Sequence, residues 1–172
     1  MKKLRGFTLI ELIVVIAIIG ILSAILGLNM MNYIANSRIK SQNNNARVIF
    51  NGAQSIVQEY KFAERKSDDA DKNIGSGTFI FYWDGHNGSA EKEGTAVSNT
   101  QFIRNFSNSV NKLFTGSEET VYKIYVKNYI VKSVVSGRTD FDRYKGSYPN
   151  KRDSETTGNI SSFGETEMQA YQ

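Results

Sequence analysis

The residue types that most often perform chemistry are scarce in this chain of 172 residues. It has no cysteine and a single histidine, His86, which follows Asp84 by two residues in the segment DGHNG. An imidazole beside a carboxylate can act as an acid–base pair or bind a metal, but a metal site needs further ligands and there is no second histidine. Asp, Gly and Asn are also typical turn residues. We therefore interpret residues 84–88 as a surface hairpin loop.

Other patterns of catalysis or cofactor binding are missing from the sequence. It contains no nucleophile elbow, Walker A loop, dinucleotide fingerprint or zinc-protease motif. The acidic runs at residues 68–71 and 140–142 can contribute calcium ligands, but neither has the spacing of an EF-hand loop. The sequence thus predicts no catalytic residue, no metal site and no cofactor, and we do not expect an enzyme.

One carboxylate, Glu11, lies inside a long apolar segment. From Phe7 to Leu28 the chain reads FTLIELIVVIAIIGILSAILGL, and Glu11 is the only charge in it. As a helix this segment would be about 33 Å long, which is enough to cross the hydrocarbon core of a bilayer. A charged side chain within a membrane helix costs about 2.5–3.5 kcal/mol on insertion scales, so it normally has a partner. Glu11 is therefore the strongest candidate for a functional residue.

The first residues give this apolar segment an orientation. Lys2, Lys3 and Arg5 precede it and no similar cluster follows it, so the positive-inside rule places the N-terminus in the cytoplasm. Without these three, 18 Lys and Arg stand against 17 Asp and Glu, and the rest of the chain is nearly neutral. A cleaved secretory signal would have a shorter apolar run and a small-residue cleavage site. A plain membrane anchor fits the length but does not explain Glu11.

About the first thirty residues resemble the N-terminus of type IV pilins and type II secretion pseudopilins, the prepilins with a class III signal. The match consists of a basic leader that ends at Gly6, the Phe7 that follows it, a glutamate at the fifth position from Phe7, and the apolar run. The resemblance implies that prepilin peptidase cuts between Gly6 and Phe7 and methylates the new amine of Phe7. It also implies that Glu11 meets the N-terminal amine of a neighbouring subunit in the assembled fibre.

The same resemblance implies a set of partners and a location. The partners are other pilin subunits in a homopolymer, prepilin peptidase, the assembly platform with its ATPase, and the plasma membrane before assembly. The protein would be a single-pass precursor and then part of an extracellular pilus for adhesion, motility or surface attachment. Two alternatives stay open: a pseudopilin of a type II secretion or DNA-uptake (competence) system, and a bitopic membrane protein with a ligand-binding head.

The sequence after the apolar run predicts a continuation of the helix. Apolar residues recur at helical spacing between Ala46 and Ala63, and residues 29–66 contain no proline. We expect one helix from about Thr8 to Arg65, weakest at the three asparagines of residues 43–45, which compete for backbone hydrogen bonds. The predicted segments are a leader (1–6), a transmembrane and assembly helix (7–28), its amphipathic continuation (29–66) and a globular head (67–172).

The head is predicted to be a small antiparallel sheet packed on the second half of the long helix. This α+β class is also the arrangement known for pilins. Residues 153–172 contain four acidic residues, no basic ones and few apolar ones, so we expect a loose tail or a cover for a sheet edge. The other predicted elements are strands at 78–83, 120–126 and 129–136, a turn at 127–128, a helix at 99–114, and a loop or edge strand at 138–150.

A basic and aromatic segment lies between Val121 and Arg152. It holds eight Lys and Arg against two acidic residues, and five tyrosines are interleaved with them. Such a surface can bind nucleic acid. Alternation along a strand would instead place every second tyrosine in the core. We favour the structural interpretation and keep a weak DNA contact through this segment as an alternative.

Overall fold

The computed structural model describes residues 7–64 and 74–172, and the chain divides into two compact units with the boundary between Ser37 and Arg38. We describe each unit by itself. The leader with Lys2, Lys3, Arg5 and Gly6, and the acidic run at 68–71, lie outside the described residues. The segment limits expected from the sequence stay predictions.

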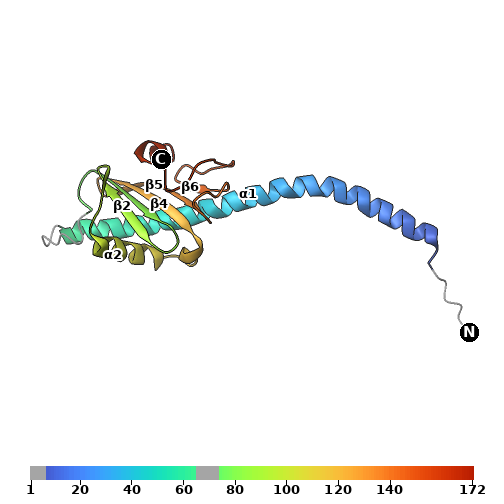
Figure 1. The fold of residues 1–172 in the computed structure, drawn as a ribbon, viewed down its shortest axis with the longest axis horizontal. Helices are drawn as coiled ribbons and strands as arrows, with labels where there is room; N and C mark the ends of the chain where they lie inside the picture. The colour runs from blue at the N-terminus through green and yellow to red at the C-terminus, as the bar shows by residue number, and fades with distance from the viewer. Residues whose placement is uncertain (1–6, 65–73) are drawn as a thin grey trace, which may run out of the picture. The chain divides into compact units, whose positions relative to one another are not determined.

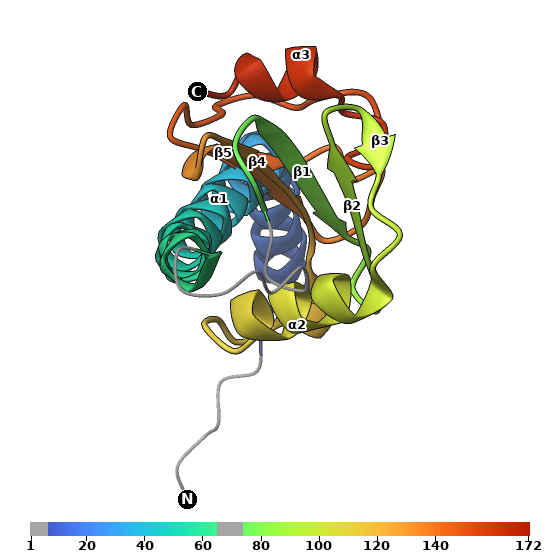
Figure 2. The same cartoon turned by 90° about the vertical axis from the view of Figure 1, so that its left-hand side faces the viewer.

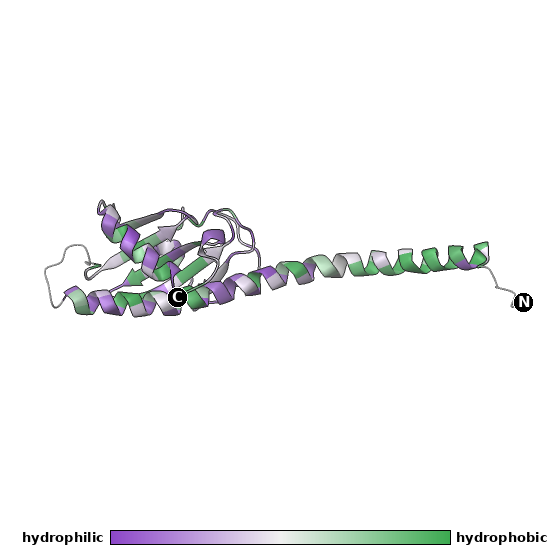
Figure 3. Ribbon diagram, turned by 90° about the horizontal axis from the view of Figure 1, so that it is seen from below, coloured by the Kyte–Doolittle hydropathy of each residue, from purple (hydrophilic) through white to green (hydrophobic). Residues whose placement is uncertain are grey.

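Helix α1 (Leu9–Glu64) confirms the single long helix expected from the sequence. It continues through the three asparagines without interruption. The side chain of Asn43 is buried and bonds to the head, so it does not compete for the hydrogen bonds of its own helix. In the first unit the helix is strongly apolar, as the hydropathy colouring of Figure 3 shows.

The second unit contains a six-stranded antiparallel sheet in the order β3-β2-β1-β4-β5-β6 (Figure 1). Strands β1, β4 and β5 and helix α2 confirm the predicted elements, with ends that differ by a few residues. Strands β2 and β3 were not predicted, because GSAEK lacks the β-branched and aromatic residues typical of strands. The bounds are β1 (Thr78–Trp83), β2 (Gly88–Lys92), β3 (Thr95–Ala96), α2 (Thr100–Asn111), η2 (Ser117–Glu119), β4 (Val121–Lys127), β5 (Ile130–Gly137), β6 (Gly146–Tyr148) and α3 (Glu165–Gln169).

One face of the sheet packs against α1 and α2. Phe106 of α2 lies at the centre, with its ring centroid 4.9 Å from that of Phe81 and 5.7 Å from that of Phe79. Asn99 caps α2 by accepting a 3.0 Å hydrogen bond from the backbone N–H of Phe102. Helix α1 contributes the stripe predicted from its spacing, of which Ala46, Ile49, Ala53, Ile56, Val57 and Tyr60 are buried.

The opposite face of the sheet is covered by the C-terminal segment and α3 (Figure 2). The prediction of a loose tail is therefore wrong. Its few apolar side chains are spaced to reach one surface, and they bury against β1, β4 and β5. Because both faces are covered, Tyr122 and Tyr125 are both fully buried, and the expected alternation of core and surface does not occur in β4. The covering residues are Ile160, Phe163, Met168 and Tyr171.

Strand β6 makes the closest approach between the sheet and α1. A Cβ atom added to Gly146 would lie 2.1 Å from the backbone nitrogen of Asn43, so no larger residue fits there. The side chain of Asn43 binds the chain on either side of this contact. Its oxygen accepts the N–H of Ser147 at 2.8 Å and of Arg152 at 3.2 Å, and its nitrogen donates to the carbonyl of Arg152 at 2.7 Å.

Candidate assembly and processing site

The first turn of α1 is closed by a pair of residues, Thr8 and Glu11. The Glu11 carboxylate accepts hydrogen bonds from the Thr8 backbone N–H at 2.9 Å and from the Thr8 hydroxyl at 2.7 Å. The backbone N–H of Glu11 approaches the Thr8 hydroxyl oxygen at 3.4 Å. This is a capping box, in which a Thr and a Glu three residues later satisfy backbone donors at the helix start. It directs the Glu11 carboxylate toward the N-terminal end of the helix.

Glu11 stands out in the sequence by its charge, whereas Thr8 was not among the predicted site residues. The signal was present, because Thr-x-x-Glu ahead of an apolar run is the sequence signature of a capping box. The structure places Thr8 next to Phe7, whose side chain is 86 % exposed. Phe7, Thr8 and Glu11 thus share one end of α1. Gly6 and the three basic leader residues lie before the described part of the chain.

The first unit carries a long run of exposed apolar side chains. All described side chains from Phe7 to Gly27 are exposed, and most are aliphatic. Among the described residues α1 is the one helix that is long and apolar enough to cross a membrane. A continuous apolar surface of this kind needs lipid or other protein around it. The geometry is therefore that of a membrane or assembly helix with a single carboxylate near its start.

The loop with Asp84 and His86 forms a turn, as predicted. The Asp84 carboxylate accepts the backbone N–H of His86 at 2.7 Å and of Asn87 at 2.5 Å. Partial burial alone would raise the pKa of Asp84, but these hydrogen bonds outweigh it and the pKa is lowered. Within residues 7–64 and 74–172, no group of three His, Cys, Asp or Glu residues is placed to hold a metal ion.

Several of the basic residues between Val121 and Arg152 are buried or engaged in ion pairs. Lys123 and Lys145 are buried, and the Nζ of each donates to backbone carbonyls. Burial lowers the pKa of both lysines. Lys127 and Arg143 form ion pairs of 3.6 and 2.6 Å with acidic residues of the C-terminal segment. This placement does not favour the predicted DNA contact, which stays an untested alternative.

The N-terminal segment is similar to known proteins. Residues 1–27 match the prokaryotic N-terminal methylation motif. Over 39 residues the chain is 49 % identical to a probable minor fimbrial protein of Dichelobacter nodosus. This aligned segment is 23 % of this chain and 24 % of that protein. Over 68 residues it is 40 % identical to the type IV major pilin protein PilA of Myxococcus xanthus. This second aligned segment is 40 % of this chain and 30 % of that protein. The chain thus spans less than a third of either relative. No solved structure matches it.

A long N-terminal helix that continues into an antiparallel α+β head defines a pilin-like protein. The methylation motif at its start and the two relatives show that the N-terminal segment is similar to that of type IV pilins and fimbrial proteins. The resemblance seen in the sequence is confirmed at this level.

Proposed function

We propose that the chain is a prepilin that is cut between Gly6 and Phe7, methylated on the Phe7 amine, and polymerised through its N-terminal helix into a type IV pilus. The observation that carries this proposal is the Thr8–Glu11 capping box at the start of a helix whose described side chains up to Gly27 are all exposed. A structural role, as opposed to an enzymatic one, agrees with relatives named as a pilin and a fimbrial protein.

The apolar helix explains how one chain can be stable in two environments. In the precursor its side chains contact lipid, and in a fibre they would contact the same helix of other copies. Lipid tails are as apolar as leucine, so apolar burial alone does not drive helices together inside a membrane. The preference of these helices for one another over lipid must therefore come from the packing of small residues and from polar pairing. Glu11 is the single charged group of the segment that can supply such a pair.

Cleavage would create the cation that Glu11 needs. Removal of the leader frees an amine on Phe7, next to Thr8 and at the helix end toward which the Glu11 carboxylate points. A second copy could present that amine to the carboxylate in place of the Thr8 hydroxyl. A buried ion pair of this kind contributes register and partner choice more than net stability. Peptidase, assembly platform and ATPase are partners on the same proposal.

Mass spectrometry of the protein from its native host tests the processing step. The N-terminal peptide should begin at Phe7 and carry one additional methyl group. A Gly6→Leu variant should keep Met1 and the leader, because the small residue at the cleavage position is lost. An intact Met1 in the unmodified protein, or a new terminus near Ala24, would contradict the proposal.

Replacement of Glu11 tests the assembly step. Glu11→Val should leave membrane insertion unchanged or improve it, since a charge leaves the apolar segment. Filaments recovered by shearing should fall by about tenfold or more, because a charge-assisted pair is lost. Glu118→Val, at an exposed glutamate of η2, is the matched control and should assemble normally. Equal filament yields for the two variants would show that the carboxylate is dispensable.

A further inference from the structure

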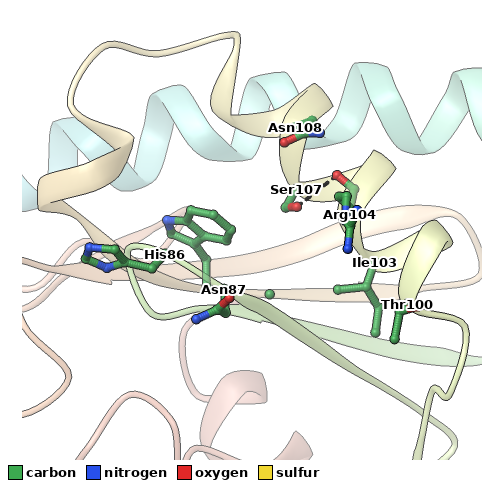
Figure 4. Close-up of a pocket in the computed structure, with 9 residues that line it drawn as sticks. His86, Asn87, Thr100, Ile103, Arg104, Ser107 and Asn108 are labelled. Carbon is green, nitrogen blue, oxygen red and sulfur yellow. Dashed lines mark hydrogen bonds between the residues drawn. The ribbon is translucent and has the colours of Figure 1, made fainter.

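A pocket lies between α2 and the turn that joins β1 to β2 (Figure 4). Its volume is about 270 Å³, at the small end of the range of about 300–1,000 Å³ typical of small-molecule sites. A space of this size fits one ring-sized ligand and not a folded partner. It belongs entirely to the second unit and is separate from the N-terminal assembly site.

One face of α2 forms the first wall of the pocket. Residues three, four, seven and eight positions apart lie on the same side of a helix. This spacing places the cation of Arg104, the amide of Asn108 and the hydroxyls of Thr100 and Ser107 along one wall, with Ile103 between them. In Figure 4 these side chains line the helix above the turn.

The turn forms the second wall, and it is held in a fixed conformation. The Asp84 carboxylate accepts hydrogen bonds from the backbone N–H groups of His86 and Asn87, which fixes the positions of both residues. Gly88 keeps the space between the walls open. A Cβ atom at Gly88 would lie 2.9 Å from Phe81 and 3.0 Å from Ile103. Both walls are thus built by the fold.

The lining of the pocket is positively charged. Arg104 is exposed, and within the described residues its guanidinium makes no hydrogen bond or ion pair. The lining contains no carboxylate, and the nearby carboxylate of Asp84 is engaged by the backbone of the turn. Arg104 is therefore available for a bidentate bond to a planar anion, which is the pairing that guanidinium geometry favours.

The remaining lining suits a ligand with several hydroxyl groups and one apolar side. Asn87 and Asn108 offer amide donors and acceptors, Thr100 adds a hydroxyl, and Trp83 and Ile103 supply apolar surface. A sugar ring has this combination of a hydroxyl rim and a C–H face. We propose that the pocket binds a carboxylated sugar, such as a uronic acid unit, with its carboxylate on Arg104.

Trp83 gives a direct measurement of binding, because it is the only tryptophan in the chain and it lines the pocket. The full chain in detergent micelles is titrated with D-glucuronic acid, and the fluorescence of Trp83 is followed. We expect a saturable change. D-glucose and acetate should each bind at least about tenfold more weakly, because glucose lacks the carboxylate and acetate lacks the sugar ring.

Substitution of Arg104 tests the assigned contact. Arg104→Gln should weaken glucuronic acid binding about tenfold and leave the weak glucose response unchanged. Arg138→Gln, at an exposed arginine outside the pocket, should bind like the original protein. Asn108→Ala, which keeps the charge, should weaken glucuronic acid and glucose alike.

Each of the opposite results would overturn the proposal. These are the absence of a saturable change with glucuronic acid, an equal response to glucose, an equal response to acetate or inorganic phosphate, and equal losses in the Arg104 and Arg138 variants. The emission spectrum of each variant without ligand shows whether the surroundings of Trp83 are intact. Processing and filament assembly do not depend on this pocket, so the two proposals fail separately.

Discussion

The two units of the chain use apolar residues in opposite ways, although α1 runs through both. Before Ser37 the described side chains of the helix are almost all exposed, and its main side-chain contact is the Thr8–Glu11 capping box. After Arg38 the same helix buries its apolar stripe against a sheet whose other face is also covered. The head is thus complete by itself, whereas the first unit needs surroundings that the single chain does not supply.

The polar residues of α1 differ between the units in the same way. In the head they bind the backbone of other elements. Gln54 accepts the N–H of Val131 at 2.8 Å, and Gln58 donates to the carbonyl of Tyr129 at 2.7 Å. In the first unit the Glu11 carboxylate accepts two hydrogen bonds from Thr8, within its own turn. In the head, polar side chains of α1 therefore hold other elements to the helix.

Removal of residues 1–28 should abolish the membrane association of the first unit and leave the stability of the head almost unchanged. Residues 29–172 should lose membrane association and remain soluble and monomeric, because the run of exposed apolar side chains from Phe7 to Gly27 is gone. The thermal unfolding midpoint should stay within a few degrees of that of the full chain in detergent, since the buried clusters lie after Ser37. Size-exclusion chromatography with light scattering and circular dichroism checks both points. Stable oligomers of the fragment would show that the head also drives assembly.

A pair of glycine substitutions sharpens the contrast. Gly146→Ala should destabilise the head by about 3 kcal/mol or more, because the added Cβ meets the backbone of α1, which cannot move aside. Gly20→Ala is the matched change in the first unit, where nothing lies within 4 Å of the added atom. It should leave head stability unchanged within about 0.5 kcal/mol. Urea unfolding followed by Trp83 fluorescence measures both, and similar losses would contradict the division into units.

Two neighbouring asparagines give the next largest effect. Asn43→Ala removes the side chain that binds Ser147 and Arg152, leaves buried backbone groups unpaired, and should cost about 2–4 kcal/mol of unfolding free energy. Asn44 is exposed, so Asn44→Ala should be neutral or stabilise slightly through the higher helix propensity of alanine. The same urea experiment compares them. A difference below about 0.5 kcal/mol would mean that Asn43 does not hold the head to the helix.

The smallest expected effect concerns the buried ammonium of Lys123. Burial lowers its pKa below the ordinary value of 10.5. Between the lowered pKa and 10.5 the unfolded chain binds more protons than the folded one, so this group makes stability rise with pH in that window. Lys123→Met removes the contribution. The stability of the original protein relative to the variant should therefore increase as the pH rises toward 10.5.

Measurement of unfolding free energies at several pH values checks this prediction. Lys112→Met, at an exposed lysine that follows α2, is the control and should show a constant difference from the original protein. A falling or flat difference for Lys123→Met would mean that the buried ammonium is not destabilised in the folded state.

The sequence predicted those elements in which apolar residues recur at helical spacing or β-branched and aromatic residues are concentrated. The stripe of α1 and the strands at 78–83, 121–127 and 130–137 carry enough apolar, β-branched or aromatic residues to be recognised. Strand β2 was missed because it is held by pairing with β1 and not by its composition. The C-terminal segment was misjudged because four apolar side chains in twenty residues suffice when their spacing matches one sheet face.

The candidate sites also differ in how far the sequence alone could predict them. Glu11 stands out in the sequence because a charge in an apolar run is costly. Thr8 carries the capping signature but no charge, so it stands out less in an apolar run. The pocket between α2 and the β1–β2 turn could not be predicted, since its walls are 12 or more residues apart and meet only once Gly88 packs against Phe81 and Ile103.

The C-terminal cover of the sheet has a consequence for the order of events during synthesis. Ile160, Phe163, Met168 and Tyr171 leave the ribosome after the strands that they cover, and the face formed by Ile80, Tyr125 and Val135 stays open until they arrive. The contact of Asn43 with Arg152 spans 109 residues and has to wait as well. Contacts of such long range form late. The head therefore closes only after the segment from Ile160 to Tyr171 has been made, and a chain that lacks this segment would expose an uncovered sheet face to proteases.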